Sequence, residues 1–509
     1  MKSMVAPFLN TRQIAKSHPQ QTAPMAIIDI GSNSIRLVIY ASQGRYPFPL
    51  YNERANCRLG EGMGYDGMLK EERIKVALAT LARFAKILSD MGISKIHAVA
   101  TAAVRRAKNA EQFTSPAAAL LNNEISVLSQ QAEANYVARG LTLNMPRATG
   151  LVADLGGCSI EIINMKNGQI KASTSFDFGH LSKIKRSQIN DAFRATDWIS
   201  AASPKRLYGV GGSFRAFASA YINQSGYPLP VLHGLTIPTK AAQRLLTAFA
   251  DKSPKLDGVP LGRQKTMPLA AEIINCLLDH CGAKEIYTSG TSIRDGVLAE
   301  RGLNDDERID FLQSVCGEIS KASHQFDDMP DSLFRFLRPL GGSLADTPNK
   351  TDKSQKRKFE RLLRAACLIS DLCWEDHEDI RGEIGARRVL GLPVNCLSHK
   401  ERVWLAIAIY HRYVGHKTNK SRPPELSAIL GCKRRLEATT VGFGLRFALM
   451  FSGGVPNCLE YLSLTSKLGV LTLRVKEQGR SLIDKHNRRR FAQLAQSASL
   501  IPEIEQESL

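Results

Sequence analysis

Residues 25–40 read MAIIDIGSNSIRLVIY: an apolar strand, a short polar turn and a second β-rich strand. Such a pattern predicts a β-hairpin. Gly31 permits a tight turn, and Asp29 just before it can hold a cation. Donors for an anion follow in the turn at Ser32, Asn33 and Ser34. A phosphate group together with Mg²⁺ fits this loop, although an ordinary polar hairpin turn fits the single segment equally well.

Two further segments repeat this design. Residues 150–161, GLVADLGGCSIE, end an apolar strand at Asp154 and place a second carboxylate at Glu161. Between the two carboxylates lie the predicted phosphate-binding residues Gly156, Gly157 and Ser159. Residues 206–213, RLYGVGGS, lead from a strand into a helix, where N–H groups favour another phosphate. The residues concerned are Gly211, Gly212 and Ser213. Because similar loops occur three times, an ordinary polar turn is the weaker interpretation of these segments.

The spacing of these loops predicts how the chain is divided. Asp29 and Asp154 are 125 positions apart, about the length of one domain, which indicates an internal duplication of one β-rich lobe. Each lobe would contribute a loop to a shared cleft. After Leu303 the pattern becomes mostly helical. The predicted division is a disordered leader over 1–24, a first lobe over 25–140, a second lobe over 141–305 and a helical region over 306–509.

The helical region combines predicted helices with basic segments. Helices are predicted within residues 305–325, 359–381 and 401–411, and a connector rich in Pro, Gly and Lys over 332–358. The apolar stretch 441–455 contains Arg446 and is interpreted as buried. Two basic segments, 353–361 and 474–490, are interpreted either as a track for a polyanion or as solvated surface.

Composition narrows the classes of partner. The chain has 68 Lys and Arg against 48 Asp and Glu, a net charge of +20, which favours a polyanion. Ten cysteines without a CxxC pair indicate neither a zinc site nor disulfides, and favour a reducing compartment, interpreted as the cytoplasm. No apolar run is long enough to span a membrane. Because no RNA-recognition signature occurs either, neither a membrane nor a specific nucleic acid is an expected partner.

Over residues 25–300 the chain resembles the exopolyphosphatase and guanosine pentaphosphate phosphohydrolase family, within the actin, sugar kinase and Hsp70 superfamily. The resemblance rests on seven strings in family order: DIGSNSIRL (29–37), RLGEGM (58–63), ATAAVRRAKN (100–109), QAEANYVARG (131–140), DLGGCSIE (154–161), GVGGS (209–213) and SIRDGVL (292–298). It implies an α/β fold of two duplicated actin-like (ribonuclease H-like) lobes with an interlobe cleft. The remainder, including SDLCWEDHEDIRGE (370–383), is similar to a mostly helical HD-like domain that some members append.

The resemblance also implies roles for single residues. Glu133 matches the catalytic glutamate, which positions and deprotonates the attacking water; a solvated glutamate on a helix face is the alternative. Arg105 matches an arginine that neutralises charge on the transferring phosphoryl group, and Arg58 is a similar candidate; both also fit a solvated face. Asp154 and Glu161 match an acidic pair suited to Mg²⁺, which Asp29 would assist through water.

Two positions depart from the family pattern. Cys158 stands where the family usually has a third glycine, so it narrows the backbone freedom of the second loop and could crowd a phosphate. Ser370 and Asp371 stand where an HD enzyme has its His-Asp pair. The histidines His377, His411 and His416 supply no matching ligand set. A second metal-dependent activity is therefore not expected.

The resemblance implies a Mg²⁺-dependent, processive exopolyphosphatase, working as a homodimer, that releases orthophosphate from the end of inorganic polyphosphate. Guanosine pentaphosphate 5′-phosphohydrolase is the alternative enzyme, because the same loops would serve a nucleotide's terminal phosphate. A kinase fits less well, because the catalytic carboxylate lies in the hydrolase position. A non-catalytic polyanion-binding regulator is the remaining alternative; it would be expected to have lost Glu133 or Asp154, and both are present.

Overall fold

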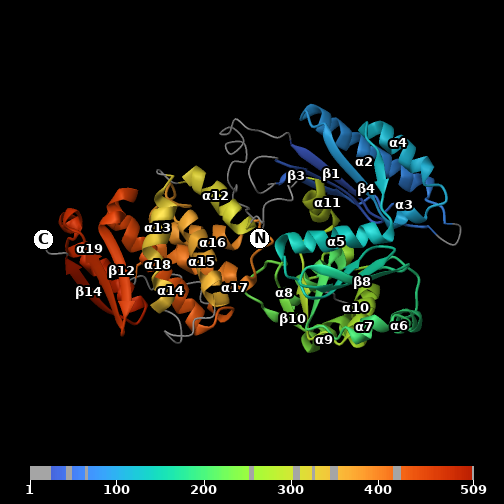
Figure 1. Cartoon of the computed structure of the whole chain (residues 1–509). Coiled ribbons are helices and arrows are strands. Elements are labelled where there is room, and N and C mark those ends of the chain that lie inside the picture. Colours follow the sequence, from blue (N-terminus) through green and yellow to red (C-terminus); the bar gives the residue numbers. More distant parts are fainter. Residues whose placement is uncertain are drawn as a thin grey trace. The chain divides into compact units, whose positions relative to one another are not determined.

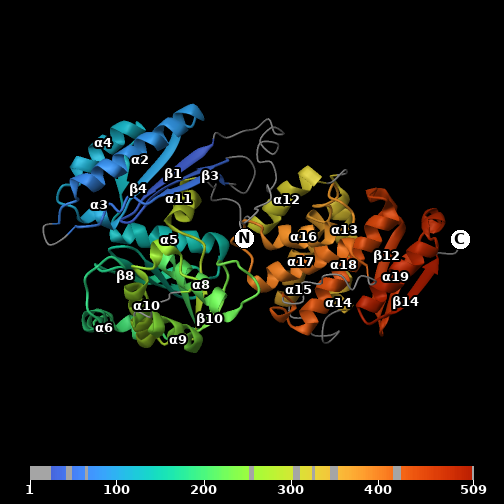
Figure 2. The same ribbon diagram turned by 180° about the vertical axis from the view of Figure 1, so that it is seen from behind.

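The structure, a computed structural model, describes residues 24–41, 49–63, 67–251, 257–301, 310–323, 327–343, 353–415 and 426–506. Residues 24–301 belong to one compact unit and residues 310–506 to another (Figures 1 and 2). The predicted leader, apart from Pro24, and the boundary predicted between residues 305 and 306 lie outside the described residues.

The first sheet of the N-terminal unit has five strands in the order β3-β2-β1-β4-β5. Its strands are β1 (Met25–Ile30), β2 (Ile35–Tyr40), β3 (Pro49–Ala55), β4 (Lys95–Ala100) and β5 (Ile125–Val127). β1 and β2 form the predicted antiparallel hairpin, and β4 runs parallel to β1. The helices between its strands are α2 (Glu71–Asp90), α3 (Ala102–Arg106) and α4 (Glu111–Leu121).

The second sheet has six strands in the order β10-β11-β9-β6-β7-β8. Its strands are β6 (Gly150–Leu155), β7 (Ile160–Lys166), β8 (Gln169–Phe176), β9 (Arg206–Val210), β10 (Thr236–Pro238) and β11 (Glu285–Thr288). The helices are α6 (Arg186–Arg194), α7 (Asp197–Ala201), α8 (Gly211–Ser225), α9 (Thr239–Ala250), η1 (Leu261–Arg263) and α10 (Met267–Cys281). Apart from β10, strand order and direction repeat those of the first sheet, as a duplicated lobe requires.

Two helices occupy equivalent places after the two sheets and pack against each other between them. α5 (Gln130–Asn144) contacts β7 and β8, and α11 (Ile293–Arg301) contacts β1 (Figure 1). A Cβ on Gly140 would lie 2.6 Å from the carbonyl oxygen of Ser292, and one on Gly296 would lie 1.9 Å from that of Tyr136. Only glycine fits at these two points, which explains the glycines of the QAEANYVARG and SIRDGVL strings.

Alternation along the central strands decides which side chains face the space between the sheets. Ile28 packs into the core beneath α2 and α4, whereas Ile27 packs with residues of α5 and α11. Because side chains two positions apart share one face of a strand, Asp29 lies on the same face as Ile27. In the second sheet, Val152 packs into that same central core, which directs Asp154 inward as well.

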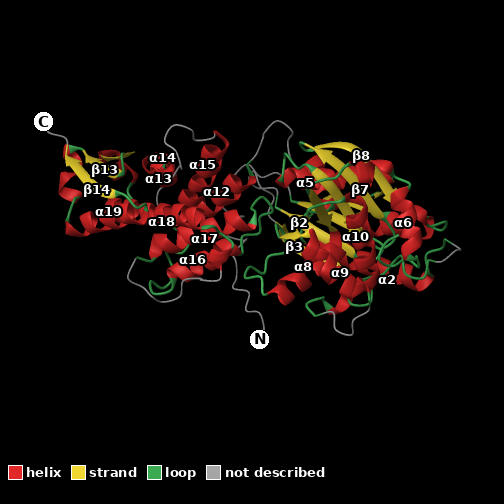
Figure 3. Ribbon diagram, turned by 90° about the horizontal axis from the view of Figure 1, so that it is seen from below, coloured by secondary structure: helices red, strands yellow, loops and turns green. Residues whose placement is uncertain are grey.

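The C-terminal unit is mostly helical (Figure 3). Its helices are α12 (Phe311–Ser323), α13 (Met329–Leu337), α14 (Leu340–Ser343), α15 (Lys353–Leu368), α16 (Arg381–Leu390), α17 (His399–Tyr413), η2 (Leu426–Ala428), α18 (Cys432–Ser452), η3 (Pro456–Tyr461), η4 (Glu477–Leu482) and α19 (Lys485–Ser497). The stretch 441–455, interpreted as buried, lies largely in α18, most of whose residues are buried.

This unit also contains a three-stranded sheet that was not predicted: β12 (Leu462–Lys467), β13 (Val470–Val475) and β14 (Ile501–Gln506). The sequence carried a signal for it, because LSLTSK and VLTLRV alternate apolar and polar residues on either side of Leu468-Gly469. In the structure these two residues form the turn, and both have positive φ. The basic segment 474–490 is thus folded, and Arg474 pairs with Glu505 of β14 at 2.7 Å.

Two further expectations about this unit are wrong. The connector predicted over 332–358 contains most of α13, all of α14 and the start of α15, because Leu333, Phe336 and Leu337 make α13 amphipathic. The helix predicted over 359–381 ends at Leu368, and turns follow until α16 begins at Arg381. The HD-like character of the unit stays a prediction.

Two further observations concern all of the residues that the structure describes. Each of the ten cysteines is free. None of the described helices is both long enough and apolar enough to cross a membrane.

Candidate active site

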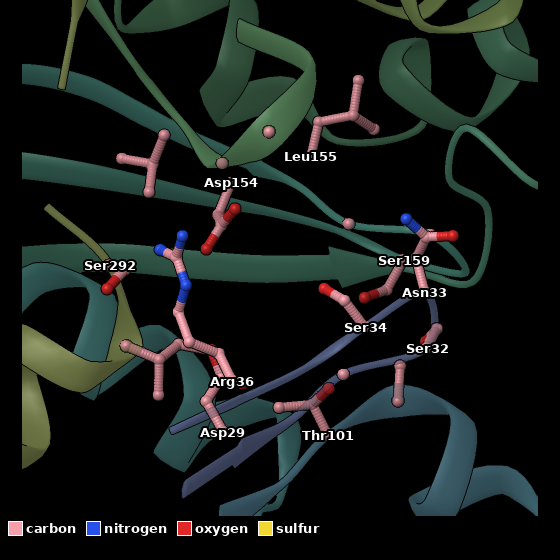
Figure 4. Close-up of a pocket in the computed structure, with 18 of the residues that line it drawn as sticks. Asp29, Ser32, Asn33, Ser34, Arg36, Thr101, Asp154, Leu155, Ser159 and Ser292 are labelled. Carbon is pink, nitrogen blue, oxygen red and sulfur yellow. The ribbon is translucent and has the colours of Figure 1, made fainter. Parts of the chain in front are cut away.

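A pocket lies where the two sheets face each other, at the ends of the strands that precede the predicted loops (Figure 4). The predicted site residues line it, with the exception of Arg58, Arg105 and Ser213. The side chains of Asp154 and Arg36 point into it from the second and first sheets, respectively (Figure 4). Residues more than 250 positions apart therefore converge, since Asp29 and Arg294 both line the pocket.

The two hairpin loops are closed by the same hydrogen bond. The N–H of Gly31 donates to the carbonyl oxygen of Ser34 at 3.1 Å, and the N–H of Gly156 donates to that of Ser159 at 3.0 Å. The N–H groups at positions 32, 33, 157 and 158 donate to no backbone carbonyl of the described residues. Such N–H groups in two facing turns are suited to bind an anion.

The second hairpin carries a pair of carboxylates. Asp154 and Glu161 are cross-strand partners in β6 and β7, so their Cβ atoms lie about 5 Å apart. Loss of hydration on burial, reinforced by the charge of Glu133, raises the pKa of Asp154 to about 7. Burial, Glu133 and Asp154 together hold the pKa of Glu161 well above its usual range, although Ser175 donates to its carboxylate at 3.2 Å. A cation between these carboxylates would stabilise both in the ionised state.

The first hairpin differs at the equivalent position. Asp29 is paired across the strands with Arg36, whereas Asp154 is paired with a second carboxylate, Glu161. Arg294 of α11 donates to Asp29 Oδ2 at 2.5 Å. Because this guanidinium already neutralises Asp29, the second hairpin is the better place for a metal ion.

The third loop approaches the second hairpin closely. Gly211 has φ 93°, and a Cβ there would lie 2.6 Å from Asp154 Oδ1, so only glycine fits beside this carboxylate. Gly212 also lines the pocket. Ser213, which we expected to bind phosphate, lies behind it: its hydroxyl is 3.2 Å from Nδ1 of His180. The helix begins at Gly211, two residues earlier, so Ser213 already points into the core.

Glu133 lies in the first turn of α5, which Ser129 caps by accepting from the N–H of Ala132. Glu133 is only 5% exposed, so the alternative of a solvated glutamate is wrong. Arg105 Nη1 donates to Glu133 Oε2 at 2.7 Å and to the carbonyl oxygen of Leu128 at 2.8 Å. Burial raises the pKa of Glu133 although Arg105 opposes this, which gives a carboxylate that is a stronger base than usual.

Arg105 is therefore a partner of Glu133 rather than part of the pocket wall. Its second terminal nitrogen, Nη2, is buried and has no hydrogen-bond partner in the described part of the chain. A buried donor without a partner is unusual in proteins, and this one lies beside the ion pair with Glu133.

Arg58 and Cys158 are placed differently from what the sequence indicates. Arg58 is 55% exposed and pairs with Glu61 at 3.5 Å, away from the pocket lining. Cys158 does not line the pocket either: a Cβ added to Gly60 would lie 3.1 Å from its sulfur, so the thiol is directed at the first lobe. The thiol does not enter the pocket, but it forms a hydrogen bond with the side chain of Ser32 in the first phosphate loop.

Sequence reasoning missed the arginines of the pocket. The lining includes Arg36, Arg54, Arg215, Arg263 and Arg294. Burial lowers the pKa of Arg36 and of Arg263 to about 10, and neighbouring arginines contribute. Two of them lie inside quoted strings, DIGSNSIRL and SIRDGVL, but Arg54 and Arg263 come from segments without any motif. Only their tertiary position identifies them.

The residues present fit Mg²⁺. No group of three or more His, Cys, Asp or Glu suited to a metal occurs among the residues that the structure describes. Mg²⁺ needs no such group, because it takes one or two carboxylates and completes its octahedron with waters and substrate oxygens. Asp154 and Glu161, two adjacent carboxylates with raised pKa values, are such a pair.

Comparisons with known proteins find relatives in sequence and in fold. Two curated relatives, each named guanosine-5′-triphosphate,3′-diphosphate pyrophosphatase, come from Pseudoalteromonas atlantica (25% identical, covering 65% of this chain and 69% of the relative) and Pseudoalteromonas translucida (27%, 54% and 58%). A solved structure described as an exopolyphosphatase from Cytophaga hutchinsonii is similar in fold, with a TM-score of 0.50 at 23% identity, and covers 55% of this chain and 99% of that chain.

Family models match both units. The model described as Exopolyphosphatase, C-terminal, matches residues 352–501. The model described as Ppx/GppA phosphatase family matches residues 37–304, more than half of the chain and the whole of the pocket apart from its residues between 29 and 36 in the first hairpin. With its two actin-like lobes and its three loops around one pocket, the chain belongs to the Ppx/GppA phosphatase family, whose members are hydrolases.

Proposed function

We propose that the protein is an exopolyphosphatase that releases orthophosphate processively from the end of inorganic polyphosphate and depends on Mg²⁺. The observation that supports this most strongly is Glu133, a buried carboxylate with a raised pKa at a pocket rich in arginine and free loop amides. A base facing an anion site suits the attack of water on a phosphoric anhydride.

Glu133 orients the attacking water and accepts its proton. Arg105 holds the carboxylate through Oε2, which leaves Oε1 for the water. As the proton moves to Glu133, negative charge develops on the phosphoryl oxygens, and the positive charge of Arg105, held beside Glu133, offsets part of it. The leaving oxygen belongs to the shortened chain, which remains bound through its further phosphates.

The loop amides hold the terminal phosphate in line with that water. The N–H groups at positions 32, 33 and 157 donate to its equatorial oxygens, and such preorganised donors stabilise charge without reorganisation. Asp154 and Glu161 would hold Mg²⁺, which neutralises phosphate oxygens when bound.

The alternative substrate is guanosine pentaphosphate, and one observation favours it: both curated relatives have names that refer to a guanosine 5′-triphosphate 3′-diphosphate. The same loops would take its terminal 5′-phosphate. A purely polyanion-binding role is the third candidate, and the raised pKa of Glu133 argues for catalysis instead.

A substrate panel tests the proposal. Phosphate release from long polyphosphate and from guanosine pentaphosphate is measured with the full chain, with Mg²⁺ and with a chelator. We expect Mg²⁺-dependent release, faster from polyphosphate. Faster release from the nucleotide would assign the alternative, and no release from either would leave binding as the function.

A further inference from the structure

The tips of the two hairpin loops are in contact with each other. A Cβ added to Gly157 in the second loop would lie 3.1 Å from the Cβ of Ser32 in the first, and the thiol of Cys158 forms a hydrogen bond with the Ser32 side chain. Figure 4 shows Ser32 and Asn33 on the same side of the pocket as Ser159. The two lobes therefore meet at their loops as well as through α5 and α11.

Arg106 reinforces this contact from α3 of the first lobe. Its Nη1 donates to the carbonyl oxygen of Cys158 at 3.2 Å and to that of Asp177, the residue after β8, at 3.5 Å. The exposed carboxylate of Asp177 is further away, at 3.9 Å. One guanidinium thus reaches two main-chain segments of the second lobe. Arg106 does not line the pocket, so it can act on the site only through the loop that it holds.

The first loop is supported by its own lobe at the place where the second loop meets it. The N–H of Gly60 donates to the carbonyl oxygen of Ser32 at 2.8 Å, and the N–H of Arg58 donates to that of Asn33 at 2.9 Å. A Cβ on Gly60 would lie 3.1 Å from the sulfur of Cys158, so the thiol occupies the space beside this glycine. Ser32 and Cys158 are both buried. The contact therefore fixes the distance between the loops.

This distance matters because both loops face one pocket with free amides. The N–H groups at positions 32, 33 and 157 all belong to residues that line it. A hydrogen bond requires its donor and acceptor to lie about 2.7–3.2 Å apart. If the loops moved apart by about 1 Å, the oxygens of a single phosphate could no longer accept from both loops with good geometry.

We propose that Arg106 is a positioning residue that, together with Cys158, holds the two hairpin loops in contact so that their amides bind the same phosphate. The inference rests on the proposed function for the reaction that it serves. The contact itself is needed by any phosphate that the two loops share. An anion between the loops should therefore stabilise the contact, and by reciprocity the contact should increase the affinity for the anion.

Thiol labelling of the full chain tests the contact without turnover. Burial raises the pKa of the Cys158 thiol, so it reacts slowly until the loops part. The rate of alkylation of Cys158 by iodoacetamide is measured by mass spectrometry of its peptide, with the buried Cys276 of α10 as the internal reference. Arg106→Gln should raise this rate about threefold to tenfold, as for the loss of one half-exposed hydrogen bond. Arg186→Gln, at a similarly exposed arginine paired with Asp279, is the control.

Inorganic phosphate provides the second arm of this test, against chloride at equal ionic strength. Phosphate should slow the alkylation of Cys158 in wild type and should slow it less in Arg106→Gln. An unchanged rate in Arg106→Gln, or no protection by phosphate in wild type, would overturn the proposal. A rise that Cys276 shares would also overturn it, because it would report general unfolding.

Kinetics then separates positioning from a loss of folded protein. Arg106→Gln should raise KM for polyphosphate about threefold to tenfold with kcat within about threefold, because the phosphate is held by one loop instead of two. Arg106→Lys retains a donor for the carbonyl oxygen of Cys158 and should recover part of the loss. A fall in kcat with KM unchanged, which a smaller folded fraction produces, would reject the positioning role. So would equal losses in the two variants.

The contribution of the thiol is tested in the same assay. Cys158→Ser retains a hydrogen bond with Ser32 and should resemble wild type more closely than Cys158→Ala does, whereas Cys276→Ala should leave KM unchanged. Equal behaviour of the Ser and Ala variants would remove Cys158 from the proposal. If wild-type protein hydrolyses neither polyphosphate nor guanosine pentaphosphate, the proposed function fails, while thiol labelling still decides whether Arg106 holds the loops together.

Discussion

Glu133→Gln is the sharpest test of the catalytic assignment. Glutamine has the same shape and can accept the same hydrogen bond from Arg105 at the position of Oε2, but it cannot take a proton from water. The loss is therefore confined to general-base catalysis, which typically contributes about 10²- to 10⁴-fold. This corresponds to roughly 3–5 kcal/mol on the barrier.

The expected change in stability is small, because two effects oppose each other. Burial disfavours the charged form of Glu133, so a neutral side chain removes an unfavourable term, while Arg105 loses its anionic partner. We expect a net change within about 1 kcal/mol. Activity should thus fall without unfolding.

The assay is phosphate release under saturating polyphosphate and Mg²⁺, with thermal unfolding measured on the same samples. Glu111→Gln is the matched control, since Glu111 also lies in the first turn of a helix, α4, but is exposed. Turnover in Glu133→Gln within tenfold of wild type, with the control unchanged, would refute the assignment of Glu133 as the base.

Three further predictions concern metal, pH and salt. Asp154→Asn should raise the Mg²⁺ concentration required for half-maximal activity, because the ion has few protein ligands to lose, whereas the exposed Asp177→Asn should not; an unchanged titration would place the metal elsewhere. Because burial lowers the pKa of His180 from 6.5 to about 3, its neutral form contributes stability that is complete above pH 6.5 and declines toward pH 3. In urea unfolding, the free energy of unfolding should therefore fall by about 2 kcal/mol more for wild type than for His180→Gln between pH 7 and pH 5. Parallel curves of the two proteins against pH would contradict this. Reversing the exposed Arg488 and Arg489 to Glu should flatten the log–log dependence of polyphosphate affinity on salt by about one to two units if α19 is part of a polyanion track; an unchanged slope would make these arginines ordinary surface.

The unexpected sheet of the C-terminal unit changes how that last experiment is designed. Truncation at Arg474 would remove the end of β13 together with α19 and β14, so a loss of activity would report unfolding rather than lost charge. Charge reversal at two exposed helix positions leaves the sheet and its Arg474–Glu505 pair intact.

Local chemistry determined the parts of this protein that could be predicted from sequence. A glycine and short polar residues between two apolar strands specify a tight hairpin. The alternation of side chains along each strand then directs Asp29 and Asp154 into the space between the two sheets. The repeat of that pattern 125 positions later predicted the duplication, and the two loops indeed close with the same backbone hydrogen bond. Resemblance supplied Glu133, whose helix position alone did not distinguish it from a solvated residue.

Tertiary structure alone decided the electrostatics of the pocket. Arg263 meets His180 across 83 positions of sequence, and Arg294 meets Asp29 across 265, so no local pattern indicates either contact. The same holds for the direction of Cys158, which depends on space next to Gly60 in the other lobe. Turns and strand faces follow from short-range sterics and periodicity, whereas the partner of a charge depends on which distant segments the folded core brings within a few ångströms.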